Sequence, residues 1–505
     1  MQMRYKSTRN SQLRLEASQV IAQGISEEGG LFVPECFPDL TEELPALAQL
    51  DYSSLAKRIF QLFLTDFSEN EIASCVEQAY TKEKFGGSHP VKLVPLTDLG
   101  EDKYLLELWH GPTCAFKDMA LQILPHFLAT SLKKVGGGKQ AVILTATSGD
   151  TGKAALEGFK NVPGTRILVF YPRDGVSPTQ KRQMVTQEGN NVGVCAIEGN
   201  FDDAQTGVKK IFTDPELKAA LDRHDMLFSS ANSINWGRLL PQIVYYFDAY
   251  LELYRQGKLE SLSTPIDVVV PTGNFGNILA AYYAKTMGLP IRKLVCASNA
   301  NNVLTDFIRT GTYDRRREFY ATTSPSMDIL VSSNLERLLY ALAGENSDRL
   351  SNWMESLAES GVYTVEEDVK EKVQELFFGG FCNDQGSANT IQELMEKEHY
   401  LCDPHTAVAV DVYRQYREAS SSPSVPTVIA STASPYKFSA SVLSALGKTP
   451  SGEDFDNLLE LETLSHTEAP EQLKALQGKP ERFSKVIPKE QAAAYVLEAL
   501  GIGGC

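Results

Sequence analysis

The sequence predicts an α/β protein built on mostly parallel sheets that helices cover on both faces. Two observations support this prediction. Short, continuously apolar runs recur along the chain from about residue 104 to residue 431, and stretches with apolar residues at helical spacing separate several of them. A strand that is apolar at successive positions buries both of its faces, which is typical of parallel sheets in α/β folds.

The predicted strands are residues 104–109, 141–145, 167–171, 192–197, 226–229, 266–270, 294–297 and 428–431. The predicted helices of this region include 119–128, 153–159, 278–287 and 404–416. The last of these has a favourable start, because Asp403 can cap the helix and Pro404 suits its first position.

The chain divides into three regions by pattern. Residues 1–90 are predicted to be a mainly helical N-terminal segment, since 51–67 and 69–80 carry apolar residues at helical spacing. Residues 91–440 form the main α/β region, in which the more polar stretch 300–395 is interpreted as an insertion of helices and loops. Residues 441–505 are predicted to be a peripheral helical extension.

The bulk composition limits the classes of function. The chain has 505 residues, 43% of them hydrophobic, and a net charge of −16, which disfavours nucleic acid or an anionic membrane as a partner. An anionic small substrate is not excluded, because the charge around the pocket, and not the net charge of the chain, decides whether such a substrate binds. No apolar run is long enough to span a membrane, and residues 1–20 lack the apolar core of a secretory signal.

The eight cysteines are dispersed, with no Cys-x-x-Cys pair and no cysteine/histidine cluster. We therefore expect no metal site and a reducing, cytoplasmic compartment.

Residues 110–118, His-Gly-Pro-Thr-Cys-Ala-Phe-Lys-Asp, contain the first candidate, Lys117. The lysine lies where a predicted strand gives way to a predicted buried helix, a common position for ligands in α/β proteins. From this position alone, Lys117 is either a reactive lysine or a structural loop charge. Cys114 is more readily interpreted as a small buried side chain than as a nucleophile, and His110 is interpreted as structural.

Residues 271–277, Pro-Thr-Gly-Asn-Phe-Gly-Asn, are the clearest candidate for a phosphate site. They join an apolar strand to a helix, so that backbone N–H groups and the helix dipole would favour an anion there. The loop lacks a Walker A lysine and the G-x-G-x-x-G spacing, which disfavours a nucleoside triphosphate or a dinucleotide. A single monophosphate ester suits it better, and a tight turn without a ligand stays open.

Two further junctions carry small hydroxyl residues. In residues 145–152, the hydroxyl groups could bind a carboxylate or a phosphate, whereas Asp150 would repel an anion unless it accepts hydrogen bonds elsewhere. Asp150 could also cap the helix that begins near residue 152. Residues 431–438 follow the last predicted strand and mark either the ligand edge of the sheet or simple helix capping.

In their order along the chain, 110–118, 145–152, 271–277 and 431–438, the four motifs resemble the threonine synthase family of pyridoxal-phosphate enzymes, which have the tryptophan-synthase-β-like fold. The resemblance spans nearly the whole chain and includes residues 5–9, 29–34, 232–236 and 324–329. The N-terminal segment and the 300–395 stretch are similar to those of the longer bacterial and fungal members. The resemblance implies fold type II: two interleaved lobes with mostly parallel twisted sheets, residues 91–440 as the catalytic region, and about 130–230 as much of a small mobile lobe.

The resemblance also implies roles for individual residues. Lys117 matches the lysine that forms the Schiff base with pyridoxal 5′-phosphate and moves protons at Cα and Cβ of the substrate. Thr432 matches a hydroxyl that faces the pyridine nitrogen, where it would not hold a proton on the ring as an aspartate does. Asp150 is expected to contribute to cofactor binding, and near the 3′-oxygen it would share a proton with it. The loop expected to hold the cofactor phosphate consists of Gly273, Asn274, Phe275, Gly276 and Asn277.

The implied reaction converts O-phospho-L-homoserine and water to L-threonine and phosphate, by γ-elimination of phosphate and addition of water at Cβ. The site must then bind the substrate's carboxylate and phosphate as well as the cofactor. The basic candidates for this role could equally be surface or ion-pair residues; they are Arg238, Lys181 and Arg182, and the same holds for Arg173. We expect a monomer or a homodimer. The candidate substrate-binding residues are Thr147, Ser148, Thr151, Asn235, Arg238, Lys181 and Arg182.

Two alternatives stay open. A phospholyase of the same family would release ammonia, 2-oxobutyrate and phosphate, with the same residues holding the cofactor. A non-catalytic pyridoxal-phosphate-binding protein is the alternative from another class, although it would have no need for Lys117 and Thr432.

Overall fold

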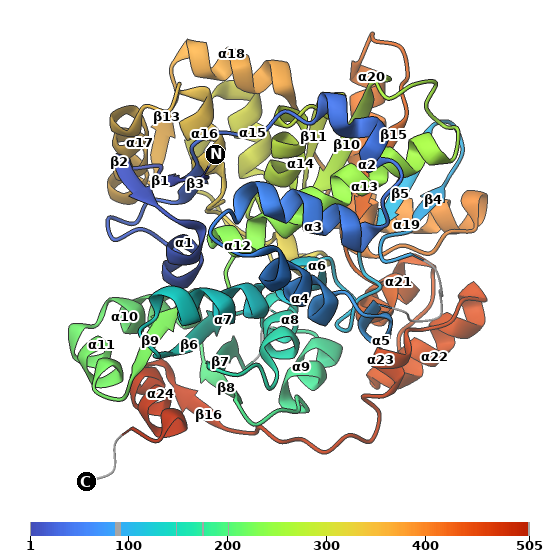
Figure 1. Cartoon of the computed structure of the whole chain (residues 1–505). Helices are drawn as coiled ribbons and strands as arrows, with labels where there is room; N and C mark the ends of the chain where they lie inside the picture. Colours follow the sequence, from blue (N-terminus) through green and yellow to red (C-terminus); the bar gives the residue numbers. More distant parts are fainter. Residues whose placement is uncertain (1, 86–91, 148, 174–175, 200, 503–505) are drawn as a thin grey trace.

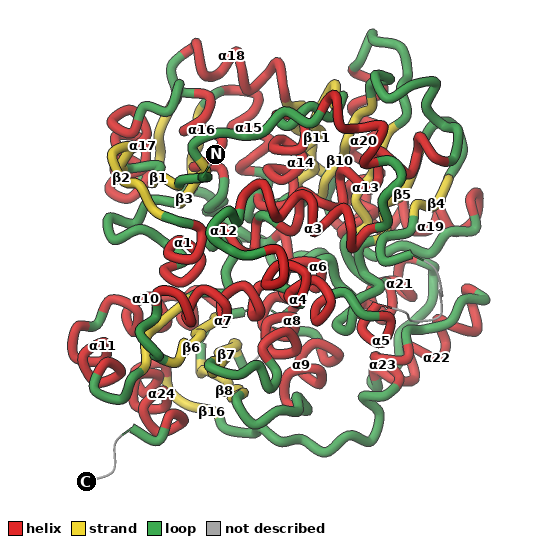
Figure 2. The backbone as a smooth tube through the Cα atoms, viewed as in Figure 1, coloured by secondary structure: helices red, strands yellow, loops and turns green. Residues whose placement is uncertain are grey.

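The computed structural model describes the chain except for residues 1, 86–91, 148, 174–175, 200 and 503–505, and except for the side chains of residues 201, 202 and 206. The elements form two lobes, each with a sheet inside and helices outside (Figures 1 and 2). In the part of the chain that is described, no helix is long and apolar enough to cross a membrane.

The larger lobe is built on a six-stranded sheet in the order β14-β11-β10-β15-β5-β4, in which only β4 runs antiparallel to its neighbour. Its strands are β4 (Leu96–Asp98), β5 (Lys103–Glu107), β10 (Ile266–Pro271), β11 (Ile291–Ser298), β14 (Phe377–Phe381) and β15 (Thr427–Ser431).

Both faces of this sheet are buried, as the sequence predicts for parallel strands. Successive side chains of a strand point to opposite faces. Val268 and Val270 of β10 accordingly lie in one core, with residues of α14 (Gly276–Thr286) and α13 (Pro241–Arg255). Val269 lies in a second core, under α20 (Pro404–Ala419). The predicted helix start is confirmed, since Asp403 accepts a hydrogen bond from the Thr406 N–H at 2.9 Å.

The smaller lobe holds a five-stranded, wholly parallel sheet in the order β16-β8-β7-β6-β9. Helices α7, α8 and α9 share the core of one face, and α10, α11 and α24 share that of the other. The strands are β6 (Gln140–Ala146), β7 (Thr165–Pro172), β8 (Val192–Glu198), β9 (Met226–Ser229) and β16 (Val486–Pro488). The helices are α7 (Leu124–Val135), α8 (Asp150–Phe159), α9 (Pro178–Val185), α10 (Phe201–Thr213), α11 (Pro215–Asp222) and α24 (Ala492–Leu500).

The structure differs from the prediction of a purely helical C-terminal extension. Helices α21 (Ser439–Ala445), α22 (Asp454–Ser465) and α23 (Glu471–Lys474) stay with the larger lobe, and the chain then crosses to the smaller lobe, where β16 pairs with β8 (Figure 1). The strand has only three residues, of which Ile487 is buried and Val486 is 42% exposed. So short a strand carries no apolar run that sequence patterning detects.

The 300–395 stretch also differs from the predicted insertion of helices and loops, because it supplies β14, the edge strand of the large sheet, and a two-stranded pair. Its elements are α15 (Val303–Thr310), β12 (Thr312–Asp314), α16 (Leu335–Leu342), α17 (Ser347–Ser360), β13 (Val362–Thr364), α18 (Glu367–Leu376) and α19 (Asp384–Glu398).

The N-terminal segment combines helices with a small antiparallel sheet in the order β2-β1-β3. Helix α3 buries Leu55, Ile59 and Phe63 along one side, the spacing expected of an amphipathic helix, and packs on α13. The elements are β1 (Tyr5–Ser7), β2 (Asn10–Leu15), α1 (Ala17–Gln23), β3 (Phe32–Pro34), α2 (Leu44–Leu47), α3 (Tyr52–Phe63), α4 (Glu69–Ala79) and α5 (Lys82–Phe85).

A short helix, α6 (Asp118–Leu121), lies where the two lobes meet and follows Lys117 directly. The predicted helix 119–128 is divided into α6 and α7, because Pro125 has no N–H to continue the first helix. Helix α8 approaches α6 closely at Gly158, where an added Cβ would lie 1.9 Å from the Leu121 carbonyl oxygen. This approach packs the C-terminal end of α8 against α6, while Asp150 at the start of α8 lies 3.7 Å from the Lys117 amine.

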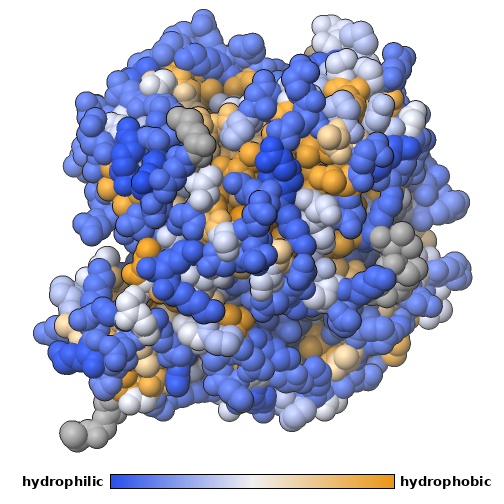
Figure 3. All heavy atoms as spheres, viewed as in Figure 1, coloured by the Kyte–Doolittle hydropathy of each residue, from blue (hydrophilic) through white to orange (hydrophobic). Residues whose placement is uncertain are grey.

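The face of the molecule in Figure 3 is mostly hydrophilic, with smaller apolar areas between the surface helices. The larger apolar side chains of β10 and α14 are buried instead, and their burial in the internal cores stabilises the fold.

Candidate active site

The loop that carries Lys117 is held against the end of the last strand of the large sheet. Strands β5 and β15 are parallel neighbours, so their carboxyl ends meet at one edge. There, the Phe116 N–H donates to the Thr432 carbonyl at 2.8 Å, and the Ser434 N–H donates to the Cys114 carbonyl at 3.1 Å. Two of the four predicted motifs are therefore joined by backbone hydrogen bonds.

Within this loop, Cys114 has the packing role that the sequence favours. Its side chain is buried, and burial raises the pKa of its thiol to about 12, which keeps it protonated and unreactive. Its φ of 58° lies in the left-handed region, which turns the chain sharply before Lys117. The turn is fixed by Asp118, which accepts hydrogen bonds from the Thr113 N–H at 2.8 Å and the Thr113 hydroxyl at 2.6 Å.

Lys117 is buried and directed at a polar cluster. Its Nζ donates to Ser326 Oγ at 3.2 Å and lies 3.7 Å from Asp150 Oδ2. Burial lowers the pKa of Lys117 to about 8; Asp150 opposes this shift, and Arg238 and Lys437 add to it. A buried lysine with a pKa near neutrality is available as an uncharged amine, which is what covalent chemistry at nitrogen requires.

Asp150 lies at the centre of this cluster. Its carboxylate accepts hydrogen bonds from Gln180 Nε2 at 3.0 Å, Ser326 Oγ at 3.1 Å and Lys437 Nζ. Burial raises its pKa, but the charges of Lys437 and Lys117 and these hydrogen bonds outweigh burial and hold the pKa well below the usual range. The predicted capping role is wrong, because α8 begins at Asp150 itself with Gly149 at the cap position.

Lys437 and Ser326 belong to the site, although the sequence assigned neither of them a role. The Lys437 side chain is fully buried and donates to both Asp150 Oδ1 and the Thr113 carbonyl, the latter at 3.0 Å. Lys437 lies in the strand-end motif 431–438, and this position is the only feature of the sequence that indicates a place in the site. Ser326 comes from the 324–329 motif, whose composition does not indicate chemistry.

The predicted phosphate loop has an unpaired donor. Tyr245 and Tyr246 donate to Asn277 Oδ1 at 2.5 and 2.6 Å, which turns the buried Nδ2 of Asn277 away from them, and this Nδ2 has no partner among the residues that the structure describes. Phe275 precedes α14 with a left-handed φ of 64° and is buried, whereas the Asn274 side chain is exposed. The first turn of α14 carries no acidic residue.

The Gly273 and Asn274 carbonyls are held from outside the loop, by Ser332 Oγ at 2.7 Å and by Asn334 Nδ2 at 3.1 Å. An added Cβ at Gly276 would meet only ordinary van der Waals contacts, the nearest at 3.4 Å from Asn334 Nδ2. The loop therefore leaves its N–H groups and the Asn277 amide for an anion.

The hydroxyl candidates divide into two groups. Thr432 is buried, and its hydroxyl has no hydrogen-bond partner among the described residues. Thr151 is partly exposed and likewise unpaired in the described part of the chain. The Thr147 hydroxyl is occupied, because it accepts hydrogen bonds from the N–H groups of Gly149 and Gly152 at 3.0 and 2.9 Å. Ser148 lies outside the described residues.

Among the basic candidates, only Arg238 lies in the buried cluster. Its Nη1 donates to the Ala231 carbonyl at 2.7 Å, it forms no ion pair with any described residue, and burial lowers its pKa to about 10. Arg182 instead binds the C-terminal chain, through the Leu476 and Lys479 carbonyls and Glu481. Lys181 and Arg173 are exposed.

The remaining candidate, Asn235, has a structural role. Its amide donates to the Ile21 and Ser230 carbonyls, each at 3.0 Å, and its oxygen accepts from the Gly237 N–H at 2.9 Å at the start of α12 (Trp236–Leu239). These hydrogen bonds leave its side chain without a free donor for a substrate.

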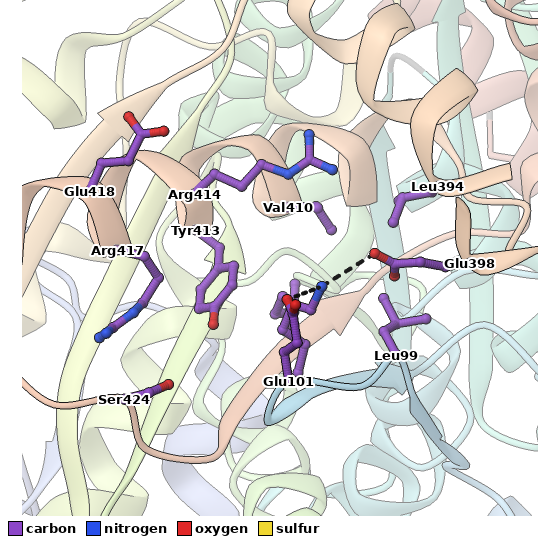
Figure 4. Close-up of a pocket in the computed structure, with 12 residues that line it drawn as sticks. Leu99, Glu101, Leu394, Glu398, Val410, Tyr413, Arg414, Arg417, Glu418 and Ser424 are labelled. Atoms are coloured by element: carbon purple, nitrogen blue, oxygen red, sulfur yellow. Dashed lines mark hydrogen bonds and ion pairs between the residues drawn. The ribbon is translucent and has the colours of Figure 1, made fainter. Parts of the chain in front are cut away.

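A separate cavity of about 390 Å³ lies beside α20 and the start of β5 (Figure 4). Tyr413, Arg414 and Arg417 of α20 line it together with Glu398, and none of the residues of the cluster around Lys117 does. Among the described residues, no group of three or more His, Cys, Asp and Glu side chains could hold a metal ion.

The residues present fit pyridoxal phosphate on three observations. Lys117 provides an amine of lowered pKa for the aldehyde, the unpaired Asn277 amide at the start of α14 provides a donor for the phosphate, and the unpaired Thr432 hydroxyl can face the ring nitrogen. All three lie at carboxyl ends of parallel strands, where ligands bind in open α/β sheets.

Comparison with known proteins agrees with this site. Three family models match: Threonine synthase N terminus over residues 4–80, Pyridoxal-phosphate dependent enzyme over 84–377, and Threonine synthase, C-terminal over 406–496. The Pseudomonas aeruginosa threonine synthase is 40% identical over 450 residues, covering 89% of this chain and 92% of the relative. The human Threonine synthase-like 1 is 40% identical over 440 residues, which is 85% of this chain but only 58% of the relative.

Solved structures give the same result. The pyridoxal-phosphate-bound threonine synthase of Brucella melitensis superposes with a TM-score of 0.85 and 36% identity, covering 98% of this chain and 99% of that one. The yeast threonine synthase gives a TM-score of 0.87 and 32% identity, with 99% of each chain covered. The family models together with these relatives show that the chain belongs to the threonine synthase family of pyridoxal-phosphate-dependent, fold-type II enzymes.

Proposed function

We propose that this protein is a threonine synthase, which converts O-phospho-L-homoserine and water to L-threonine and phosphate. The observation that carries the proposal is the buried Lys117 amine of lowered pKa, in a cluster with a buried arginine that pairs with no described carboxylate; the phosphate loop adds an amide donor that has no partner among the described residues. The bacterial and yeast relatives named threonine synthase support it.

Arg238 is the proposed ligand of a substrate anion, which we take to be the phosphate. A buried arginine without a counter-ion carries an uncompensated charge, and an anionic ligand would supply the missing partner. The chain has a net charge of −16, yet the cluster around Lys117 contains the cations Arg238 and Lys437. The site is therefore locally suited to an anionic substrate. Thr151, whose hydroxyl has no partner among the described residues, is the better of the described hydroxyl candidates for a substrate oxygen.

Pyridoxal phosphate, when bound, supplies an electron sink that makes hydrogens near the amino-acid nitrogen acidic. Lys117 is proposed to take and return protons at Cα and Cβ, because its pKa of about 8 lets the amine act as base and the ammonium as acid near neutral pH. Asp150 keeps a negative charge beside this amine, and Thr432 offers the ring a hydroxyl rather than a carboxylate. Closure of the smaller lobe would exclude water until the step that consumes it.

Product analysis tests the proposal. The purified protein, supplied with pyridoxal phosphate and O-phospho-L-homoserine, should release threonine and phosphate in equal amounts, as measured by proton and phosphorus NMR. Appearance of 2-oxobutyrate and ammonia without threonine would establish the phospholyase instead. If borohydride fixes no cofactor on Lys117, both activities are excluded, and a non-catalytic binding protein remains.

The proposed compartment, oligomeric state and class of partner are those expected from the sequence. We propose that the protein acts in the cytoplasm as a monomer or homodimer, on a small molecule rather than on nucleic acid or a membrane. The seven described cysteines are free, which agrees with a reducing compartment.

A further inference from the structure

Ser326 occupies a position between the catalytic lysine and its counter-ion. Its hydroxyl accepts a hydrogen bond from Lys117 Nζ at 3.2 Å and donates one to Asp150 Oδ2 at 3.1 Å, while Lys117 and Asp150 themselves are 3.7 Å apart. Each charged group is therefore closer to the serine hydroxyl than to the other charged group, so Ser326 bridges them by hydrogen bonds.

The backbone of Ser326 is fixed on two sides. Its N–H donates to Nε2 of the buried His405 at 3.2 Å, within the short 3-10 turn Pro325–Met327. On the other side, its carbonyl oxygen packs against the phosphate loop, where an added Cβ at Gly273 would lie 2.9 Å from it. The glycine thus allows the serine to reach the lysine, and His405 holds it there.

The direction of the Ser326 hydroxyl follows from its partners. An ionised carboxylate has no hydrogen to donate, so the Ser326 O–H must point at Asp150. The serine can then only accept from Lys117, which must direct an N–H at it. Once Lys117 is an uncharged amine, its lone pair consequently points away from the serine.

We propose that Ser326 is a positioning residue that orients the Lys117 amine, so that its lone pair faces the cofactor and the substrate. This inference rests on the proposed role of Lys117 as the cofactor lysine. Transfer of the lysine proton through the serine to Asp150 is excluded, because the Asp150 pKa lies far below that of Lys117 and protonation there would be strongly uphill.

Covalent capture of the cofactor is the first test, since it needs the oriented lone pair but no turnover. Cofactor-free protein is mixed with pyridoxal phosphate, quenched with borohydride at intervals, and the modified Lys117 peptide is measured by mass spectrometry. Ser326→Ala should slow capture about 10-fold, as expected for loss of one orienting hydrogen bond to an amine, while Ser326→Thr retains the hydroxyl and the wild-type rate. Equal rates in all three proteins would overturn the proposal.

A double-mutant cycle separates orientation of the lysine from direct binding of the cofactor. If Ser326 acts only through Lys117, adding Ser326→Ala to Lys117→Ala should leave the non-covalent affinity for pyridoxal phosphate unchanged. A further loss of affinity in the double variant would show direct contact and would contradict the proposal.

Ser324→Ala is the matched control, because Ser324 lies beside the same turn but contacts Asn299 instead of Lys117. It should leave the capture rate as in the wild type. In turnover, Ser326→Ala should lower kcat about 10-fold with little change in KM. The proposed function can fail separately: wild-type protein that captures the cofactor at Lys117 but makes no threonine refutes the function and not the role of Ser326.

Discussion

Replacing Lys437 by methionine is expected to destabilise the protein by about 3–5 kcal/mol, the usual loss when one partner of a buried ion pair is removed. Methionine fills nearly the same volume, so little of the loss comes from packing. The variant leaves Asp150 as a buried carboxylate that, among the described residues, is ion-paired only with Lys117, 3.7 Å away.

The magnitude follows from the contacts that are lost. Lys437 donates one hydrogen bond to Asp150 and one to the Thr113 carbonyl, and each hydrogen bond from a charged donor contributes about 1.5–3 kcal/mol. Gln180, Ser326 and Lys117 still contact Asp150, and Gln183 reaches the Thr113 carbonyl at 3.4 Å. These remaining partners place the expected loss near the lower end of the range, about 3 kcal/mol.

The destabilisation caused by Lys437→Met should be larger at neutral pH than in acid. The pKa of Asp150 is held below its usual range in the folded protein, so its ionised form stabilises the fold above the unfolded pKa of about 4 and loses this contribution as the pH falls. Without Lys437, the folded pKa of Asp150 rises. The difference between wild type and variant should therefore be full at pH 7 and become smaller below about pH 4.

The assay is equilibrium unfolding of the cofactor-free protein in urea, followed by circular dichroism, for Lys437→Met, Asp150→Asn and the double variant. The double variant should be less destabilised than the sum of the single variants, since Asp150→Asn removes the carboxylate that Lys437→Met leaves without its nearest cation. Lys153→Met is the control: the Lys153 side chain is 9% exposed and paired with Glu157 and Gln187, so its loss should lower stability without slowing capture of the cofactor. Strict additivity, or a wild-type midpoint for Lys437→Met, would refute the reasoning.

Arg238→Gln is expected to raise the KM for O-phospho-L-homoserine about 10- to 100-fold, while capture of pyridoxal phosphate stays normal. The control Arg182→Gln should change only stability. Steady-state kinetics of the two variants distinguish these outcomes. Capture of pyridoxal phosphate by the cofactor-free protein should rise with pH and reach half its maximum near pH 8, because only the uncharged Lys117 amine reacts; a midpoint above about pH 10 would contradict its lowered pKa. Asn277→Ala should weaken the binding of pyridoxal phosphate about 5- to 50-fold but leave the binding of pyridoxal unchanged, as measured by equilibrium titration. An equal loss of affinity for both ligands would show that the Asn277 amide does not bind the phosphate.

Local patterns in the sequence were enough to predict the fold class and the positions of the site loops. Apolar runs predicted strands β6–β11 and β15, because parallel strands buried on both faces need no partner to be detected. The Lys117 loop and the 273–277 loop were found for a related reason. Glycine, hydroxyl and lysine residues at strand ends stand out against an apolar background, and their order identified the family.

Short elements that depend on distant partners could not be predicted in this way. Strand β16 forms only because β8 offers it an edge, and β14 lies in a stretch whose polarity indicated an insertion. Strand β16 has only three residues, and two glycines interrupt the phenylalanines of β14, so neither forms a continuous run long enough to be recognised alone.

The assignment of partners within the site was decided by the tertiary structure. Asp150 and Lys437 are separated by 287 residues, and Lys117 and Ser326 by 209, so no spacing rule relates them. Burial likewise separated Arg238, which has no counter-ion in the described part of the chain, from Arg182, which binds the C-terminal chain. The sequence by itself determined which residue types could do the chemistry and near which strand ends they lie. Only packing of the two lobes decided which charges are desolvated together, and it is this desolvation that lowers the pKa of Lys117.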